Sequence, residues 1–123
     1  MKRIAFPTLS EGLDAQLSLH FGHSATFTLI HYEEATKEII KVECVSNAPH
    51  QSGGCMVPVM LLKNEGVDEV VLGGIGMRPL MGFLQVGIKP YAGIKGTVKE
   101  NFEAFINEKL NEMTQGTCSG GGH

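Results

Sequence analysis

Asp-Glu-Val-Val-Leu-Gly-Gly-Ile-Gly-Met-Arg-Pro, residues 68–79, is the stretch that decides the fold. Its run Val70-Val71-Leu72 is apolar without polar alternation, which is typical of a strand covered on both faces in a parallel sheet. The next residues allow a sharp turn because glycine reaches positive φ cheaply, and Pro79 suits the first turn of a helix. The stretch therefore predicts a central strand whose carboxyl end opens into a glycine loop, where α/β folds usually bind ligands.

Length and composition indicate one globular domain. The chain has 123 residues, 42% of them hydrophobic, and this length and composition are enough for a buried core. Its net charge is −3. The charge gives no sign of nucleic-acid or anionic-membrane binding. No apolar run approaches the ~20 residues of a membrane span, and the start enters a strand without a signal segment. We expect a cytoplasmic protein whose three cysteines are reduced.

Periodicity and turn signals predict eight elements. The expected strands are 3–7, 25–32, 37–45, 68–72 and 88–92, and the expected helices are about 55–65, 79–86 and 98–113. The polar turn 33–36 between two alternating strands indicates an antiparallel hairpin. Thr97 and Glu100 form a capping-box pattern ahead of the last helix, whose apolar stripe runs to Met113.

This order predicts an α/β fold: a single domain with a ribonuclease-H-like, mixed five-stranded sheet and three helices. The second strand should run antiparallel and the other four parallel. Residues 1–113 would form the domain, and 114–123 a flexible Gly/Ser tail with Cys118 and His123. Cys44 has the pattern of an inward-facing strand position and is assigned to the core.

The strand directions place loops 8–24, 46–54, 73–78 and 93–97 at one edge of the sheet. Four candidate metal ligands then surround one rim: His20, His23, His50 and Cys55. Imidazole nitrogens ligate metals when neutral, and a helix N-terminus lowers the pKa of a thiol such as Cys55. Partly exposed loop histidines and a simply buried cysteine are the plainer alternatives.

The glycine loop is a candidate anion site at the same rim. The groups that would contribute are Gly73, Gly74, Gly76 and Arg78. Loop amides and a helix N-terminus favour an anion, although close packing of the loop against the sheet explains the glycines equally well. Cys118 and His123 would begin at the opposite edge, because the last helix runs away from the rim, so they are not assigned to this site.

Five short motifs together resemble a known family. They are His20-Phe21-Gly22, the Gly-Gly-Cys-x-x-Pro segment 53–58, Gly66-Val67-Asp68, Gly73-Gly74-Ile75-Gly76 and Gly87-Ile88. This series, which covers the chain to about Met113, resembles the nitrogenase iron–molybdenum cofactor biosynthesis family of NifX-type and NafY-type carriers and the end of NifB-type proteins. The resemblance implies that the chain binds an iron–sulfur or iron–molybdenum-type cofactor or precursor. It also implies donor or acceptor proteins for handover of that cargo.

A nuclease and a small regulator are the alternatives to a carrier. The cysteine triplet of the NifB-type radical-SAM module is absent, and no nucleophile–base pair emerges from the spacing, so we expect no enzyme activity. A nuclease would need several convergent carboxylates, and the rim offers Glu11 and Asp14 but few others. A small nucleotide- or anion-binding regulator without metal is the stronger alternative, because it needs only the glycine loop and Arg78.

Overall fold

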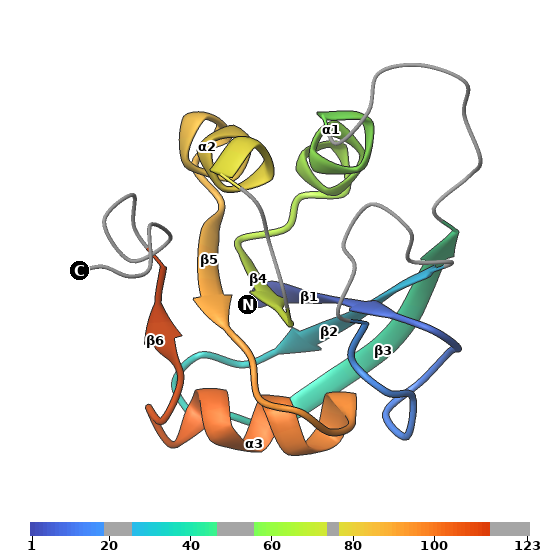
Figure 1. The fold of residues 1–123 in the computed structure, drawn as a ribbon. Helices are drawn as coiled ribbons and strands as arrows, with labels where there is room; N and C mark the ends of the chain where they lie inside the picture. The colour runs from blue at the N-terminus through green and yellow to red at the C-terminus, as the bar shows by residue number, and fades with distance from the viewer. Residues whose placement is uncertain (19–25, 47–55, 74–76, 114–123) are drawn as a thin grey trace.

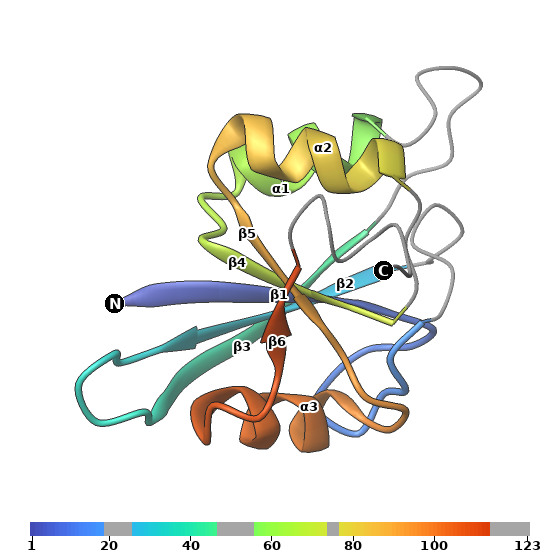
Figure 2. The ribbon, with the colours of Figure 1, turned by 60° about the vertical axis from the view of Figure 1, so that its left-hand side comes forward.

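The computed structural model describes residues 1–18, 26–46, 56–73 and 77–113, with the backbone alone at 56–58 and 77–80. One sheet is covered by α1 and α2 on one face and by α3 on the other (Figures 1 and 2). The strands are β1 (Lys2–Thr8), β2 (Thr26–Tyr32), β3 (Ile39–Ser46), β4 (Glu69–Leu72), β5 (Lys89–Ala92) and β6 (Asn111–Glu112). The helices are α1 (Met56–Asn64), α2 (Met77–Val86) and α3 (Val98–Ile106).

The sheet has the order β3-β2-β1-β4-β5-β6. Strands β1, β4 and β5 are parallel neighbours, whereas β2 runs antiparallel to both β1 and β3. The directions expected for the first five strands are therefore confirmed. The polar turn closes the β2–β3 hairpin with Lys37 in the left-handed region at φ 67°, and the N–H of Lys37 donates to the carbonyl of Glu33 at 2.7 Å.

Alternating side chains give the sheet two cores. Phe27 and Leu29 contribute to the core under α1 and α2, while Ile30 and Tyr32 contribute to the core under α3. In β4, Val70 and Val71 are both fully buried and belong to opposite cores. The continuous apolar run thus has the physical cause expected of it, because both faces of β4 are covered.

Helix α3 begins as expected but ends early. Thr97 and Glu100 form the predicted capping box. The helix then stops at Ile106, and Glu108 takes a left-handed conformation at φ 60°. The chain reverses there and adds β6 antiparallel to β5. The prediction of a helix to residue 113 and the prediction of five strands were therefore wrong. Apolar residues after Ile106 continue the helical spacing, but they are buried by a segment that is no longer helical.

The core assignment of Cys44 also needs correction. Its strand, β3, lies at the edge of the sheet, and Cys44 is only half-buried. An edge strand has a neighbour on one side alone, so inward-pointing residues on it keep part of their surface exposed.

Within the described ranges, none of the helices combines the length and the apolar character that a membrane crossing requires.

Candidate functional site at the carboxyl edge of the sheet

Several strand ends meet at one edge of the sheet. β1 ends at Thr8, which lies opposite Thr26 at the start of β2, and Thr26 lies opposite Ser46 at the end of β3. β4 is parallel to β1 and ends at Leu72, whose carbonyl accepts a 2.8 Å hydrogen bond from the N–H of Gly93 just beyond β5. We call this side of the sheet the carboxyl edge, after the ends of β1, β4 and β5.

Helices α1 and α2 begin on the same side. Each leads the chain to the opposite edge, where the N–H of Asp68 donates to the carbonyl of Arg3 at 2.8 Å and the N–H of Lys89 donates to the carbonyl of Asp68 at 3.1 Å. The first turns of both helices consequently lie toward the carboxyl edge, as Figure 2 shows. The described residues that border segments 19–25, 47–55 and 74–76 therefore all lie at this edge.

These three segments contain most of the predicted site. His20, His23, His50, Cys55, Gly74 and Gly76 lie outside the described residues. Gly73 is described and half-buried directly after β4, and Arg78 is the second residue of α2, with its side chain outside the description. The common edge agrees with the expectation from strand direction. The convergence of the side chains on one ligand stays a prediction.

Two described loops form a fixed wall beside this edge. The N–H of Ser18 donates to the carbonyl of Pro7 at 2.7 Å, which holds the end of loop 9–18 against β1. The N–H of Leu17 donates to the carbonyl of Gly96 at 2.9 Å, and the N–H of Val98 donates to the carbonyl of Ala15 at 2.9 Å. Loop 9–18 is thereby joined to loop 93–97 and to the start of α3.

Asn101 anchors the second of these loops from inside. Its buried amide nitrogen donates to the carbonyls of Ile94 and Thr97 at 3.0 and 2.9 Å, and its oxygen accepts from the N–H of Ile94 at 2.8 Å. Gly93 packs so closely here that an added Cβ would lie 2.6 Å from Leu17 Cδ2 and 2.9 Å from Asn101 Oδ1. The wall is thus built by hydrogen bonds and close packing rather than by exposed loop residues.

A row of hydroxyl groups crosses the sheet at the same edge. Thr8 Oγ1 lies 2.8 Å from Thr26 Oγ1 and 3.2 Å from Thr28 Oγ1, and Thr28 Oγ1 lies 3.8 Å from Cys44 Sγ. This row was not predicted from the sequence, although Thr26 and Thr28 on an otherwise apolar strand face were a visible signal. Because the hydroxyls bond to one another, they support the edge rather than offer ligands to a cargo.

A polar cluster around His31 lies toward the edge opposite the carboxyl edge. His31 accepts a hydrogen bond from Arg3 Nε at 3.2 Å and is hydrogen-bonded through Nε2 to Glu43. The hydrogen bond from His31 lowers the pKa of the Glu43 carboxyl. This histidine is occupied by protein partners. Among the described residues, no group of three or more His, Cys, Asp or Glu side chains is arranged to hold a metal ion.

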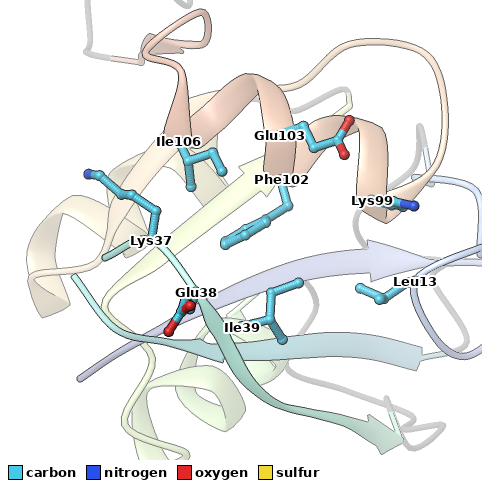
Figure 3. Close-up of a pocket in the computed structure, with 8 residues that line it drawn as sticks. All are labelled: Leu13, Lys37, Glu38, Ile39, Lys99, Phe102, Glu103 and Ile106. Atoms are coloured by element: carbon cyan, nitrogen blue, oxygen red, sulfur yellow. The ribbon is translucent and has the colours of Figure 1, made fainter. Parts of the chain in front are cut away.

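Two hollows lie on the α3 side of the sheet. One, of about 560 Å³, is formed between α3 and the start of β3, where the side chains of Ile39, Phe102 and Ile106 face one another (Figure 3). The other, of about 440 Å³, contains Tyr32, Glu69 and Tyr91. Glu69 is buried there, and its burial raises the pKa of its carboxyl. All fully buried side-chain nitrogen and oxygen atoms of the described residues have hydrogen-bond partners, so neither hollow contains a fully buried polar side-chain atom without a partner.

The fold is that of a small α/β domain in which the ends of three parallel strands meet at one edge, the place where open α/β sheets usually bind ligands. The family model described as dinitrogenase iron-molybdenum cofactor matches residues 2–108, and the chain belongs to this family.

Several individual proteins are similar to this chain. The uncharacterized protein MJ0580 of Methanocaldococcus jannaschii is 29% identical over 101 residues, which cover 80% of this chain and 83% of the relative. A Thermotoga protein, TM1290, which carries the provisional name NifB, is 27% identical with a TM-score of 0.74, over 91% of this chain and 93% of the other. The apo orange protein of Desulfovibrio gigas has a TM-score of 0.80 at 23% identity, over 93% and 94% of the two chains, and shares the fold.

Proposed function

We propose that the chain binds an iron–sulfur or iron–molybdenum-type cluster, or its precursor, and hands it to an acceptor protein. The observation that carries this proposal is the position of the three motif segments. The described residues on either side of segments 19–25, 47–55 and 74–76 all lie at one edge of the sheet. The chain that places them there belongs to the dinitrogenase iron-molybdenum cofactor family. A ribonuclease-H-like arrangement of the first five strands is part of the same proposal and is supported by their order.

The proposed metal ligands are His20, His23, His50 and Cys55. Thiolate sulfur and imidazole nitrogen are the donors that suit iron in such clusters. Cys55 directly precedes the first residue of α1, where the helix N-terminus favours a thiolate. A carrier needs few protein ligands, because a fully ligated cluster would not leave.

The glycine loop would hold the charge of the cargo. Iron–sulfur clusters bound by thiolates are anionic, and backbone N–H groups at a helix N-terminus attract anions. Gly73, Gly74 and Gly76 have no side chains that would block an approach to the amides, and Arg78 would add a positive charge. The fixed wall of loops 9–18 and 93–97 would keep this edge in place while cargo enters and leaves.

The role we propose is that of a cytoplasmic carrier rather than an enzyme. Handover requires binding and release, and no nucleophile–base pair emerges from the spacing of the sequence. The cluster is cargo in this scheme, so its chemistry belongs to the donor and acceptor proteins.

Anaerobic loading tests the proposal. The protein is incubated with ferrous iron, sulfide and a thiol reductant, then desalted and measured by visible absorbance and by iron and acid-labile sulfide content. We expect a cluster band in the parent protein and at least about tenfold weaker retention in His20→Ala and Cys55→Ala, the loss of one ligand being worth 1.4 kcal/mol or more. Release is followed as transfer of iron to an added apo iron–sulfur protein.

Cys44→Ser is the matched control, because it removes a thiol near the same edge and keeps a hydrogen-bonding group beside Thr28. It should load as the parent does. Equal loading of His20→Ala, Cys55→Ala and the parent would place the site elsewhere. A parent protein that never loads, but is stabilised against heat by a nucleotide, would favour the regulator.

A further inference from the structure

Strand β3 forms an open edge of the sheet. It is eight residues long and has β2 as its neighbour on one side, while no other described strand pairs with its outer side (Figure 1). Ile39 and Ile40, at its start, are 40% and 56% exposed. The strand at the other edge, β6, has only two residues. A long edge strand with exposed apolar side chains is a template for pairing with another strand.

We propose that β3 pairs antiparallel with β3 of a second copy of this chain, with the two-fold axis at Val42, so that the two sheets become continuous. The same strand then serves both copies, as a closed two-fold interface requires. This interface is independent of the proposed cargo site.

The direction of the side chains limits the possible registers. Lys41 and Glu43 lie opposite His31 and Leu29 in β2, whereas Val42 lies opposite Ile30, which belongs to the core under α3. Side chains that lie directly opposite one another across an antiparallel pair point to the same face. In a continuous two-fold sheet, a residue therefore pairs with its own counterpart or with one an even number of positions away.

Charge selects among the remaining registers. With Val42 on the axis, Lys41 of each copy lies opposite Glu43 of the other, which forms two attractive pairs. With Lys41 or Glu43 on the axis, two like charges would face each other, which destabilises a strand pair. With Cys44 on the axis, Glu43 would face Val45 and Lys41 would lie beyond the end of the partner's strand. The Val42 register is therefore the one that satisfies both charges.

The local geometry fits this register. The register of the β2–β3 pair shifts at Ile40, which lies between the β3 partners of His31 and Tyr32. Residues 41–43, at the centre of the proposed β3–β3 pair, keep regular strand pairing with β2. Glu43 bonds to His31 through Oε2, which leaves Oε1 for Lys41 of the second copy. The exposed side chain of Ile40 would lie beside Cys44 and Val45 of the second copy, which covers apolar surface that water otherwise contacts.

Charge reversal tests the interface. Sedimentation equilibrium across a concentration series should show dimers of the parent protein. Lys41→Glu and Glu43→Lys should each raise the dimer dissociation constant at least about tenfold, because two attractive pairs become repulsive. Mixing the two single variants should restore dimers as heterodimers, and the double variant Lys41→Glu/Glu43→Lys should dimerise by itself. Recovery in the double variant separates the Val42 register from one with Glu43 on the axis.

Lys95→Glu is the control, since it makes the same charge change at an exposed position away from β3 and should leave the dimer unchanged. Circular dichroism and urea unfolding check that each variant is folded. Glu43→Gln, which keeps an acceptor for His31, replaces Glu43→Lys if that variant does not fold, and should weaken the dimer by less. A parent protein that stays monomeric to its solubility limit, or a Lys41→Glu variant that dimerises like the parent, would overturn the proposal.

Discussion

Tyr32 donates a 2.8 Å hydrogen bond to the buried carboxylate of Glu69 and so joins β2 to β4 across β1. Lys2 of the intervening strand places its ammonium 3.7 Å from the other carboxylate oxygen. Burial raises the pKa of Glu69, while the hydrogen bond from Tyr32 and the charge of Lys2 act in the opposite direction. This pair lies at the edge opposite the proposed cargo site and connects three neighbouring strands of the sheet.

Tyr32→Phe should lower the free energy of unfolding by about 2 kcal/mol, because a buried carboxylate loses its donor while the packing of the ring is kept. Urea unfolding at neutral pH measures the change. Tyr91→Phe is the control, since the hydroxyl of Tyr91 makes no hydrogen bond to the described residues; its effect should be within ~0.5 kcal/mol. Equal effects of the two variants would show that the bond to Glu69 contributes nothing.

The raised pKa of Glu69 predicts a pH dependence with a definite sign. The Glu69 carboxyl holds its proton more tightly in the folded state than in the unfolded chain. Its contribution to the free energy of unfolding is therefore favourable below the ordinary pKa of about 4.3 and is lost as the pH rises through the raised pKa. Glu69→Gln does not titrate. Its stability relative to the parent protein should therefore increase between about pH 4 and pH 7, as followed by urea unfolding at each pH.

Glu43→Gln provides the opposite case. The pKa of Glu43 is lowered, first by the hydrogen bond from His31, so its contribution is present above the ordinary pKa and is lost as the pH falls through the lowered value. Relative to the parent, Glu43→Gln should gain stability toward acid pH, where Glu69→Gln does not. A stability difference that is constant with pH for both variants would contradict the two pKa directions.

Much of the fold could be predicted because the sequence pattern has a direct physical cause. Strand β2 alternates between two apolar faces, and the run in β4 is apolar on both, since each lies inside the sheet. The prediction failed after Ile106. Leu110 and Met113 continue the helical spacing, yet they are buried on opposite sides of the sheet by a chain that reverses at Glu108. Spacing alone does not report such a reversal.

The candidate site divides in the same way. Strand direction was enough to predict that the segments carrying its residues begin and end at one edge, because parallel strands all end on the same side of a sheet. The wall could not be foreseen, since the bond from Leu17 to Gly96 and the contacts of Asn101 join residues distant in sequence through loop conformations without a periodic pattern. The assignment of His20, His23, His50 and Cys55 to one ligand shell concerns residues outside the description and stays a prediction.

Gly93→Ala should destabilise the wall. The new Cβ would lie 2.6, 2.8 and 2.9 Å from atoms of Leu17, Val71 and Asn101, so packed side chains would have to move. Overpacking of this kind costs about 1–3 kcal/mol, measured as a lower midpoint in urea. Loading with iron and sulfide should also weaken if the wall positions the cargo edge.

Gly87→Ala is the matched control for the substitution at Gly93. Gly87 has φ 83° and no heavy atom within 4 Å of an added Cβ, so alanine there meets backbone strain without a steric clash. Its cost should be about 1 kcal/mol with no effect on loading. A Gly93→Ala protein as stable as the parent would show that loops 9–18 and 93–97 are not close-packed in solution.

Two truncations test where the domain ends. A chain ending at Met113 keeps Leu110 and Met113, both 8% exposed, and keeps the 2.8 Å hydrogen bond from the N–H of Met113 to the carbonyl of Pro90. Its free energy of unfolding should match that of the full chain within a few tenths of a kcal/mol. A chain ending at Asn107 loses β6 and both apolar side chains, which should cost about 3 kcal/mol or more at 1.5–3 kcal/mol for each buried side chain. Urea unfolding of the three chains decides the matter: a large loss on removal of 114–123 alone would mean that this segment packs against the domain and that the boundary at Met113 is wrong.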